Sequence, residues 1–368
     1  MKKGRLLIGI LIFVGALSCS SPLLSQQINI DTASARAVLK ALHDPDLSYE
    51  LAMTIAKLEG NQGMIKKMHE LEEADTEEQF ARALVAAAHD QAAGTPQEEH
   101  YDFGSVKVSS TAISLLLDQV ERGFGKEIGD RIRPYAGKTD TVSVKGFVVA
   151  GGDGSGYAFG ESDFYINIAK NDDTLMVKQD IIHEAYHGVQ GAVYREDPEL
   201  WTKKFKRPTD QARGKLCSNF AELFMDMRNE GTASYVGTGE MLKDATGATG
   251  KRLYAEYLYA RNHLGDSAGL LEISIASLQA PHAVPYKLVY NIDFFGRGIV
   301  YNISSAMVEA IADQDGPGAV GQVIQQPGYE FVLGYARLKS YGKDNDYPRL
   351  GENTVRAAQL LHDGCPAS

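Results

Sequence analysis

The chain has 368 residues, of which 44% are hydrophobic and 23% are charged, and its formal net charge is −11. These values are typical of a globular protein, so they argue against a bundle of membrane helices and against an intrinsically disordered chain. An acidic chain is also a poor partner for nucleic acid, because phosphate binding needs a cationic surface. We therefore expect no nucleic-acid partner.

The first 25 residues have the pattern of an export signal. Lys2, Lys3 and Arg5 form a basic start, and an apolar run follows from Leu6 to Leu17. Such a run is short for a bilayer-spanning helix and is typical of a signal peptide. We expect residues 1–25 to be a signal, and the protein to be exported to the periplasm, the cell surface or the medium.

The end of this signal permits two processing routes. Residues 16–19, Ala-Leu-Ser-Cys, resemble a lipoprotein signal, which would place an acyl group on Cys19 and tether the protein to a membrane surface. Ordinary cleavage near Ser25 is the alternative. Once Cys19 is acylated or removed, Cys217 and Cys365 are the remaining cysteines. Two thiols of an exported protein can form a disulfide if the fold brings them together.

The part that follows the signal is predicted to be helical. Apolar residues at helical spacing, interrupted by glycines, indicate helices over 31–92, and a further helix is expected over 109–124. Asp31 and Thr32 are candidate caps for the first helix. We assign residues 28–135 to a helical N-terminal region.

The pattern then changes to that of strands. Residues 141–150 are rich in β-branched side chains and residues 163–170 alternate in polarity, which predicts two strands of an antiparallel or mixed sheet. The glycine-rich run between them, residues 151–156, lacks the Gly-Lys-Ser/Thr ending of a phosphate-binding loop. A flexible hairpin is the better interpretation of this run.

From residue 175 the chain is predicted to be mainly helical. The expected helices cover residues 176–193, 219–236, 251–263, 299–312 and 353–362. The whole pattern predicts an α+β fold, in which a helical N-terminal portion is followed by a small sheet and a mainly helical remainder.

The segment His183-Glu184-Ala185-Tyr186-His187 carries the chemistry. On a helix the two histidines lie on one face, so both imidazoles can bind one tetrahedral zinc ion. Glu184 projects beside them and can deprotonate a water molecule that the zinc ion activates. The alternative is a solvated helix face that has this pattern by chance. Apart from Glu184, the residues between the histidines, Ala185 and Tyr186, are uncharged, and a strand is predicted before the helix. Both features favour the metal site, and Thr174 is a candidate helix cap.

Catalytic zinc usually has three protein ligands and one open position. Val193 stands where a third histidine would complete the HExxHxxGxxH motif, so the remaining ligand is expected among the carboxylates of 219–236. Glu230 is followed by small residues that would allow a close approach to the histidine helix. Glu222 is the alternative, and it forms a carboxylate pair with Asp226 one turn later.

HExxH followed by a helix with Glu-Gly-x-Ala resembles the gluzincin metallopeptidases, the thermolysin-like superfamily, and is most similar to exported bacterial groups with an EGxA motif. This resemblance covers roughly residues 141–236 and implies a zinc ion held by His183, His187 and Glu230. The Glu-x-x-x-Asp form of thermolysin would instead map onto Glu222 and Asp226.

The resemblance also implies a zincin-like catalytic region, which we place over residues 140–312, with a small mixed sheet and the HExxH helix. It implies a sheet edge along the cleft, for which the strand before the motif, residues 164–170, is the candidate. The gap between His187 and Glu230 is long, so residues 201–213 are expected to loop out. A C-terminal helical region is predicted over 313–368.

Sites of this type use a hydrogen-bond donor to stabilise the oxyanion. The candidates are Tyr235, Tyr290, Tyr301, His263 and His282, of which we favour Tyr301 and Tyr290. Asp226, one helical turn before Glu230, is a candidate hydrogen-bond partner for a ligand histidine.

The sequence thus predicts a zinc-dependent hydrolase, most directly a peptidase that acts on a peptide or protein with Glu184 as general base. One alternative is a zinc hydrolase for a non-peptide substrate, because the motif defines the activated water and not the substrate. The other is a non-catalytic binding protein on a zincin scaffold, which the intact Glu184 disfavours. The sequence makes no prediction of the oligomeric state.

Overall fold

The computed structural model describes residues 27–71, 76–137, 143–205, 207, 210–280, 282–296 and 298–365. The predicted signal and the candidate acylation site Cys19 lie outside this part of the chain. In the part described, no helix has both the length and the apolar character needed to cross a membrane.

A strand that was not predicted opens the described chain, and helices follow it as expected. The elements are β1 (Gln27–Asp31), α1 (Ala33–Leu42), α2 (Tyr49–Ala56), α3 (Glu59–Glu70), α4 (Glu77–Ala88), α5 (Pro96–Glu99) and α6 (Phe103–Ile132). The end of β1 determines how α1 is capped. The Asp31 carboxylate accepts the backbone N–H of Ala33, whereas the Thr32 hydroxyl donates to Glu121 and makes no cap.

The sheet is mixed, as predicted, and its strand order is β1-β2-β4-β3. Strands β2 (Ser143–Val149) and β4 (Asp163–Asn167) are parallel neighbours, and β3 (Gly156–Ala158) pairs antiparallel with β4 at the edge. The prediction of a hairpin over 151–156 is therefore wrong, because parallel neighbours cannot be joined by a tight turn. The chain crosses to the edge, forms β3 and returns as β4.

This topology also corrects the expected edge strand. Residues 164–167 belong to β4, which is paired on both sides, so the free edge beside the cleft is β3. The glycine run that leads to β3 is held in place by Asn167. Its amide accepts the N–H of Gly151 and donates to the carbonyl of Gly152, and both glycines have positive φ angles of 130° and 74°.

The rest of the chain is helical. Its longer elements are α7 (Thr174–Val193), α8 (Leu200–Lys204), α9 (Gln211–Val236), α10 (Ala248–Arg261), α11 (Leu264–Gln279), α12 (Tyr286–Tyr290), the π-helix η5 (Asn291–Gly296), α13 (Ile299–Asp315), α14 (Gly318–Val323), α15 (Gly328–Ala336) and α16 (Glu352–His362). The α+β class is thus confirmed. The segment 201–213 does not simply loop out, because α8 and the start of α9 form within it and pack on each other.

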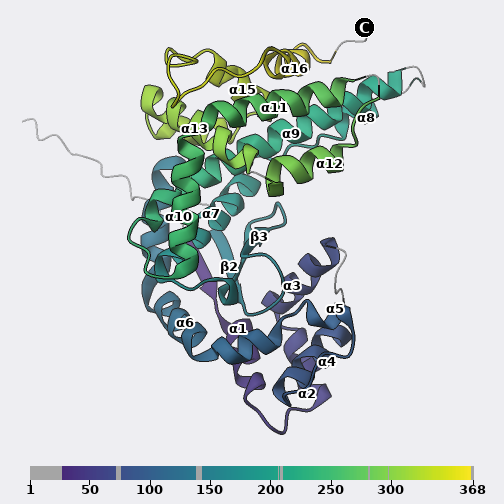
Figure 1. The fold of residues 1–368 in the computed structure, drawn as a ribbon, viewed down its shortest axis with the longest axis vertical. Coiled ribbons are helices and arrows are strands. Elements are labelled where there is room, and N and C mark those ends of the chain that lie inside the picture. The colour runs from purple at the N-terminus through teal and green to yellow at the C-terminus, as the bar shows by residue number, and fades with distance from the viewer. Residues whose placement is uncertain are drawn as a thin grey trace, which may run out of the picture.

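Figure 1 shows how these elements are arranged. The N-terminal helices α1–α6 occupy one end of the molecule, helices α9 and α11–α16 occupy the other, and the sheet and α7 lie between them. A disulfide joins Cys217 of α9 to Cys365, which follows α16, and so ties the C-terminal segment to the helix that carries Glu230.

A helix cap on α7 and a close packing contact of α9 both differ from what the sequence predicted. Helix α7 is capped by the Asp173 carboxylate, which accepts the N–H of Leu175, so the cap precedes the expected Thr174. On α9, a Cβ at Gly231 would lie 2.5 Å from Cβ of Ser304 on α13. Gly231 therefore allows a close approach of α13. The sequence-based interpretation, in which the small residue after Glu230 allows a close approach of the histidine helix, is corrected in this respect.

Candidate metal centre

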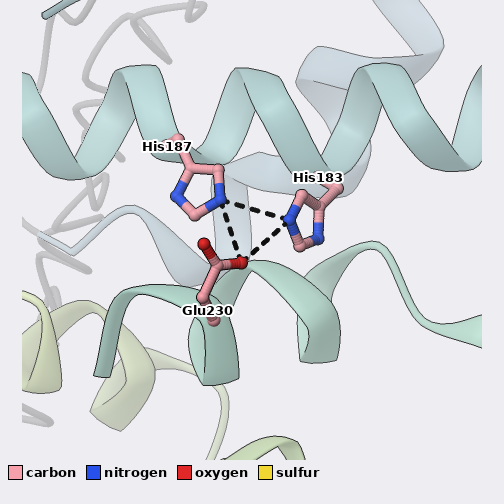
Figure 2. Close-up of side chains that lie close together, drawn as sticks. All are labelled: His183, His187 and Glu230. Atoms are coloured by element: carbon pink, nitrogen blue, oxygen red, sulfur yellow. Dashed lines mark hydrogen bonds and ion pairs between the residues drawn. The ribbon is translucent and has the colours of Figure 1, made fainter. Parts of the chain in front are cut away.

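The side chains of His183, His187 and Glu230 meet between α7 and α9. Figure 2 shows both imidazoles pointing from α7 toward the carboxylate on the facing helix. Oε2 of Glu230 lies 3.2 Å from Nε2 of His183 and 3.4 Å from Nε2 of His187, and the two imidazole nitrogens are 3.1 Å apart. Among the described residues this is the group of histidine and carboxylate ligands that could hold a metal ion.

These separations fit a tetrahedral zinc ion. Zinc–nitrogen and zinc–oxygen bonds of about 2.0–2.1 Å in tetrahedral geometry place the ligand atoms about 3.3 Å apart. The three observed distances of 3.1, 3.2 and 3.4 Å lie around that value. Two imidazole nitrogens and a carboxylate oxygen are also the donor types that zinc prefers. The residues present therefore fit zinc with three protein ligands and one open position.

Gln190 orients the second histidine. Its Oε1 lies 2.8 Å from Nδ1 of His187, so a proton on Nδ1 leaves Nε2 free to act as a metal ligand. The Nε2 amide group of Gln190 donates to the carbonyl of Asn229 and to the hydroxyl of Thr232, which flank Glu230. One buried amide thus fixes the ring of His187 and links it to the helix that carries the third ligand.

His187 is protonated at neutral pH when no metal is bound. Burial by itself lowers the pKa of His187, but the neighbouring Glu230 carboxylate overrides this effect and raises that pKa to about 9. Burial by itself raises the pKa of Glu230, but His187 and His183 hold it well below its usual range. The metal-free pair is therefore an imidazolium and a carboxylate at neutral pH.

Glu184 lies beside the ligands on the same helix and is 8% exposed. Strand β3 confines it, because a Cβ at Gly156 would lie 2.7 Å from Cγ of Glu184. Burial raises the pKa of the Glu184 carboxyl above its ordinary value, although the two histidines oppose the shift. A carboxylate with a raised pKa is better matched to proton transfer at neutral pH than one with an ordinary value.

A cleft of about 910 Å³ opens over the three candidate ligands and Glu184. The edge strand β3 lines one side, and Lys67 of the N-terminal helix α3 contributes to its wall. Tyr290 and Tyr301 also line it. The ring centroid of Tyr301 is 6.4 Å from that of His183. The cleft therefore contains the predicted ligands, the predicted base and both favoured donors.

Both tyrosines keep their hydroxyl protons at neutral pH. Burial raises the pKa of Tyr301 well above its usual range, and the charges of Glu230 and Glu184 add to the effect. Burial and the charges of Asp226 and Glu230 raise the pKa of Tyr290 to about 12. Each phenol can thus donate a hydrogen bond to an oxygen that gains negative charge in this cleft.

Comparison with known proteins agrees with this geometry. Residues 53–344 match the model of a family described as "Putative zinc dependent peptidase (DUF5700)". The chain belongs to this family. The DUF5700 match spans more than half of the chain and includes α3, strands β2–β4 and all three candidate ligands. No curated protein and no solved structure matches the chain.

Other candidates of the sequence lie elsewhere in this DUF5700 chain. Glu222 is two helical turns from Glu230 and is not part of the ligand group. Asp226 does line the cleft, but the hydroxyl of Tyr286 donates to it at 3.3 Å, so its partner is a tyrosine and not a ligand histidine. Tyr235 packs against Tyr135. The remaining candidates, His263 and His282, do not line this cleft among the described residues.

Three residues of the site were missed by sequence reasoning. Gln190 follows His187 by three residues, so it shares its helix face, and a buried ligand histidine needs such a partner. That signal was available in the sequence. Lys67 and Gly156 are far from the motif in sequence and reach the cleft only through the fold.

Proposed function

We propose that the chain is a zinc-dependent peptidase of the gluzincin type, with His183, His187 and Glu230 as metal ligands and Glu184 as general base. The observation that carries the proposal is the spacing of the three ligand atoms, which matches one tetrahedral ion. Membership of a zinc peptidase family supports it independently.

A zinc ion at this site would supply Lewis acidity. Glu184 would accept a proton from the attacking water at a carboxylate oxygen and deliver it to the leaving amine nitrogen. Tyr301 would donate its hydroxyl hydrogen to the oxygen of the carbonyl under attack, and Tyr290 is the alternative donor. Tyr301 is favoured because it lies against His183 and is influenced by the charges of both Glu184 and Glu230.

The substrate is proposed to be an extended polypeptide. Strand β3 pairs with β4 and has no second strand partner among the described residues, and its residues Gly156–Ala158 line the cleft. An exposed strand edge offers backbone N–H and C=O groups that can pair with an extended chain. Such pairing would hold the scissile bond near Glu184, because a Cβ added at Gly156 would lie only 2.7 Å from Cγ of Glu184.

The deciding experiment compares the wild-type protein with the Glu184→Gln and His183→Ala variants. We expect the wild-type and Glu184→Gln proteins to bind about one zinc ion per chain, and His183→Ala to lose it. Cleavage of unfolded casein should disappear in Glu184→Gln although the metal remains. Equal and negligible zinc content in all three proteins would rule out the proposed metal site. Zinc retained without any peptide cleavage would favour a non-peptide substrate or a binding role.

We also propose that the chain is exported, either free or tethered through an acylated Cys19. The disulfide between Cys217 and Cys365 supports this, since such bonds persist in oxidising compartments. Mass spectrometry of the mature N-terminus distinguishes cleavage before an acylated Cys19 from cleavage near Ser25.

A further inference from the structure

A second cleft, of about 920 Å³, adjoins the metal cleft. The residues that line both clefts are Gln179, Ser234, Phe295 and Tyr301. Gln179 lies one helical turn before His183 on α7, and Ser234 lies one turn after Glu230 on α9. The two clefts therefore meet where the two ligand-bearing helices leave the metal site, with Tyr301 at the junction.

The wall of the second cleft is largely apolar and aromatic. Its large apolar side chains are Leu242, Leu253, Tyr257, Tyr259, Leu270, Phe294 and Phe295. Two of them are strongly exposed, since Tyr259 is 56% and Phe295 is 71% accessible. Three charged residues also line it, of which Arg252 and Glu256 pair with each other at 2.6 Å and Asp266 is the third. A neutral, apolar ligand suits such a wall better than a charged one.

Exposed apolar side chains are frequent in the part of the chain that forms one wall of this cleft. Of the 13 large apolar residues that are exposed in the described chain, seven lie between α10 and η5. These seven are Leu258, Tyr259, Leu270, Ile273, Leu288, Ile292 and Phe295. Scattered single residues of this kind are ordinary, but three of the seven, Tyr259, Leu270 and Phe295, line the second cleft. Exposed apolar residues that gather beside a candidate active site are typical of a binding surface.

The segment η5 presents Phe295 to both clefts. Its π-helical turn buries Asp293 completely, and the hydroxyl of Ser274 on α11 donates to the Asp293 carboxylate at 2.7 Å. The same turn leaves Ile292 and Phe295 facing solvent. Because π-helical turns are rare and occur frequently at functional sites, an outward Phe295 at the junction is best explained by a ligand that covers it.

We propose that the second cleft binds an apolar, aromatic-rich segment of the polypeptide substrate, beyond the residues next to the scissile bond. This inference rests on the proposed peptidase function, and it adds a substrate class. A chain that fills both clefts extends well beyond the scissile bond, so the substrate class is a long, unfolded or extended protein segment. Tyr259 and Phe295 are the residues that select the apolar side chains.

The test measures binding without turnover, in zinc-loaded Glu184→Gln protein. The probes are a long unstructured peptide with spaced phenylalanines and a matched peptide with serines in their place, both fluorescently labelled for anisotropy. We expect the phenylalanine peptide to bind about tenfold more tightly, which is the scale of one aromatic contact that is lost on truncation to alanine. Adding Tyr259→Ala or Phe295→Ala should bring the ratio of the two affinities close to one.

Tyr49→Ala is the matched control, because Tyr49 is an exposed aromatic residue of α2 that lines neither cleft. The control should keep the tenfold ratio. Equal binding of the two peptides, or a ratio that Tyr259→Ala and Phe295→Ala leave intact, would overturn the inference. So would sedimentation of a dimer that Phe295→Ala dissociates, since a second copy of the chain would then cover the cleft.

Assays of wild-type protein loaded with zinc distinguish failure of the second-cleft inference from failure of the peptidase function. Cleavage of both peptides at equal kcat/KM would remove the second-cleft inference and leave the peptidase in place. Preferential binding of the phenylalanine peptide with no cleavage of either would remove the peptidase function. The second cleft would then stand as a binding site for apolar polypeptide segments.

Discussion

At the scale of single residues, the site depends on groups that hold the candidate ligands as well as on the ligands themselves. The side chain of Gln190 contacts His187, the carbonyl of Asn229 and the hydroxyl of Thr232. Partners of this kind fix the tautomer and the ring orientation of a ligand histidine. Gln190 is therefore part of the candidate metal centre, although it is not one of the three candidate ligands.

We predict that Gln190→Ala lowers zinc affinity by about 10- to 100-fold, because the ring of His187 loses its orienting partner. Gln190→Glu should bind zinc more tightly than Gln190→Ala, since a carboxylate can also accept the Nδ1 proton. Competition with a chelator measures both affinities. Circular dichroism of the metal-free proteins checks that the fold is kept. An affinity equal to that of wild type in Gln190→Ala would contradict the assigned role.

The protonation of metal-free His187 leads to a second prediction at this scale. Because the pKa of His187 is raised to about 9 without metal, zinc must displace one proton at neutral pH. Zinc affinity should then rise about tenfold per pH unit between about pH 6 and pH 8, and level off above about pH 9. Calorimetry in buffers of different ionisation enthalpy counts the released proton. An affinity that is independent of pH in this range would show that His187 is already neutral.

The same pair affects the stability of the metal-free protein. A raised histidine pKa contributes stability that is fully present below the unfolded value, 6.5, and is lost as the pH rises through about 9. Zinc binding reverses this dependence of stability on pH, because His187 must be neutral to bind the ion and loses its proton more readily as the pH rises. Thermal unfolding of the two forms across this range should therefore diverge as the pH rises.

At the scale of elements, the close contact of α9 and α13 positions Glu230. A Cβ at Gly231 would meet both the side chain and the backbone of Ser304, at 2.5 to 2.9 Å, so α13 would have to move. We predict that Gly231→Ala destabilises the protein by about 1–3 kcal/mol and weakens zinc binding, because the adjacent ligand moves with its helix. Denaturant unfolding and zinc titration measure the two effects.

Gly269→Ala is the matched control for this prediction. Gly269 lies inside α11, where an added Cβ meets nothing within 4 Å. The substitution should stabilise the protein by up to about 1 kcal/mol, because alanine is the better helix former, and it should leave zinc binding unchanged. If Gly231→Ala is as stable as Gly269→Ala and binds zinc as tightly, the close contact of α9 with α13 does not position Glu230.

At the scale of the whole molecule, the disulfide between Cys217 and Cys365 closes a loop with a sequence separation of 148. Cross-links over long loops reduce the entropy of the unfolded chain. We predict that the Cys217→Ser/Cys365→Ser double variant loses about 2–5 kcal/mol of stability. A reductant should lower the Tm of the wild-type protein and leave that of the variant unchanged. Equal Tm values for the two proteins would contradict a structural role for the bond.

The motif on α7 was predictable because helical spacing is a local property. His183 and His187 fall on one face whenever the segment is a helix, and Glu184 follows from the same spacing. The mixed sheet and the helical character of the remainder also follow from local patterns. The identity of the third ligand could only be narrowed to Glu230 or Glu222, since each lies on the same predicted helix.

Only the tertiary structure decided which surfaces meet. It placed β3 at the edge, set Gly231 against α13, brought Lys67 into the cleft wall and put the second cleft beside Tyr301. These facts depend on contacts between residues far apart in the chain, which no local periodicity encodes. The sequence alone therefore determined the chemistry of the candidate site. The packing of distant elements decided which carboxylate meets the two histidines and which residues form the cleft around them.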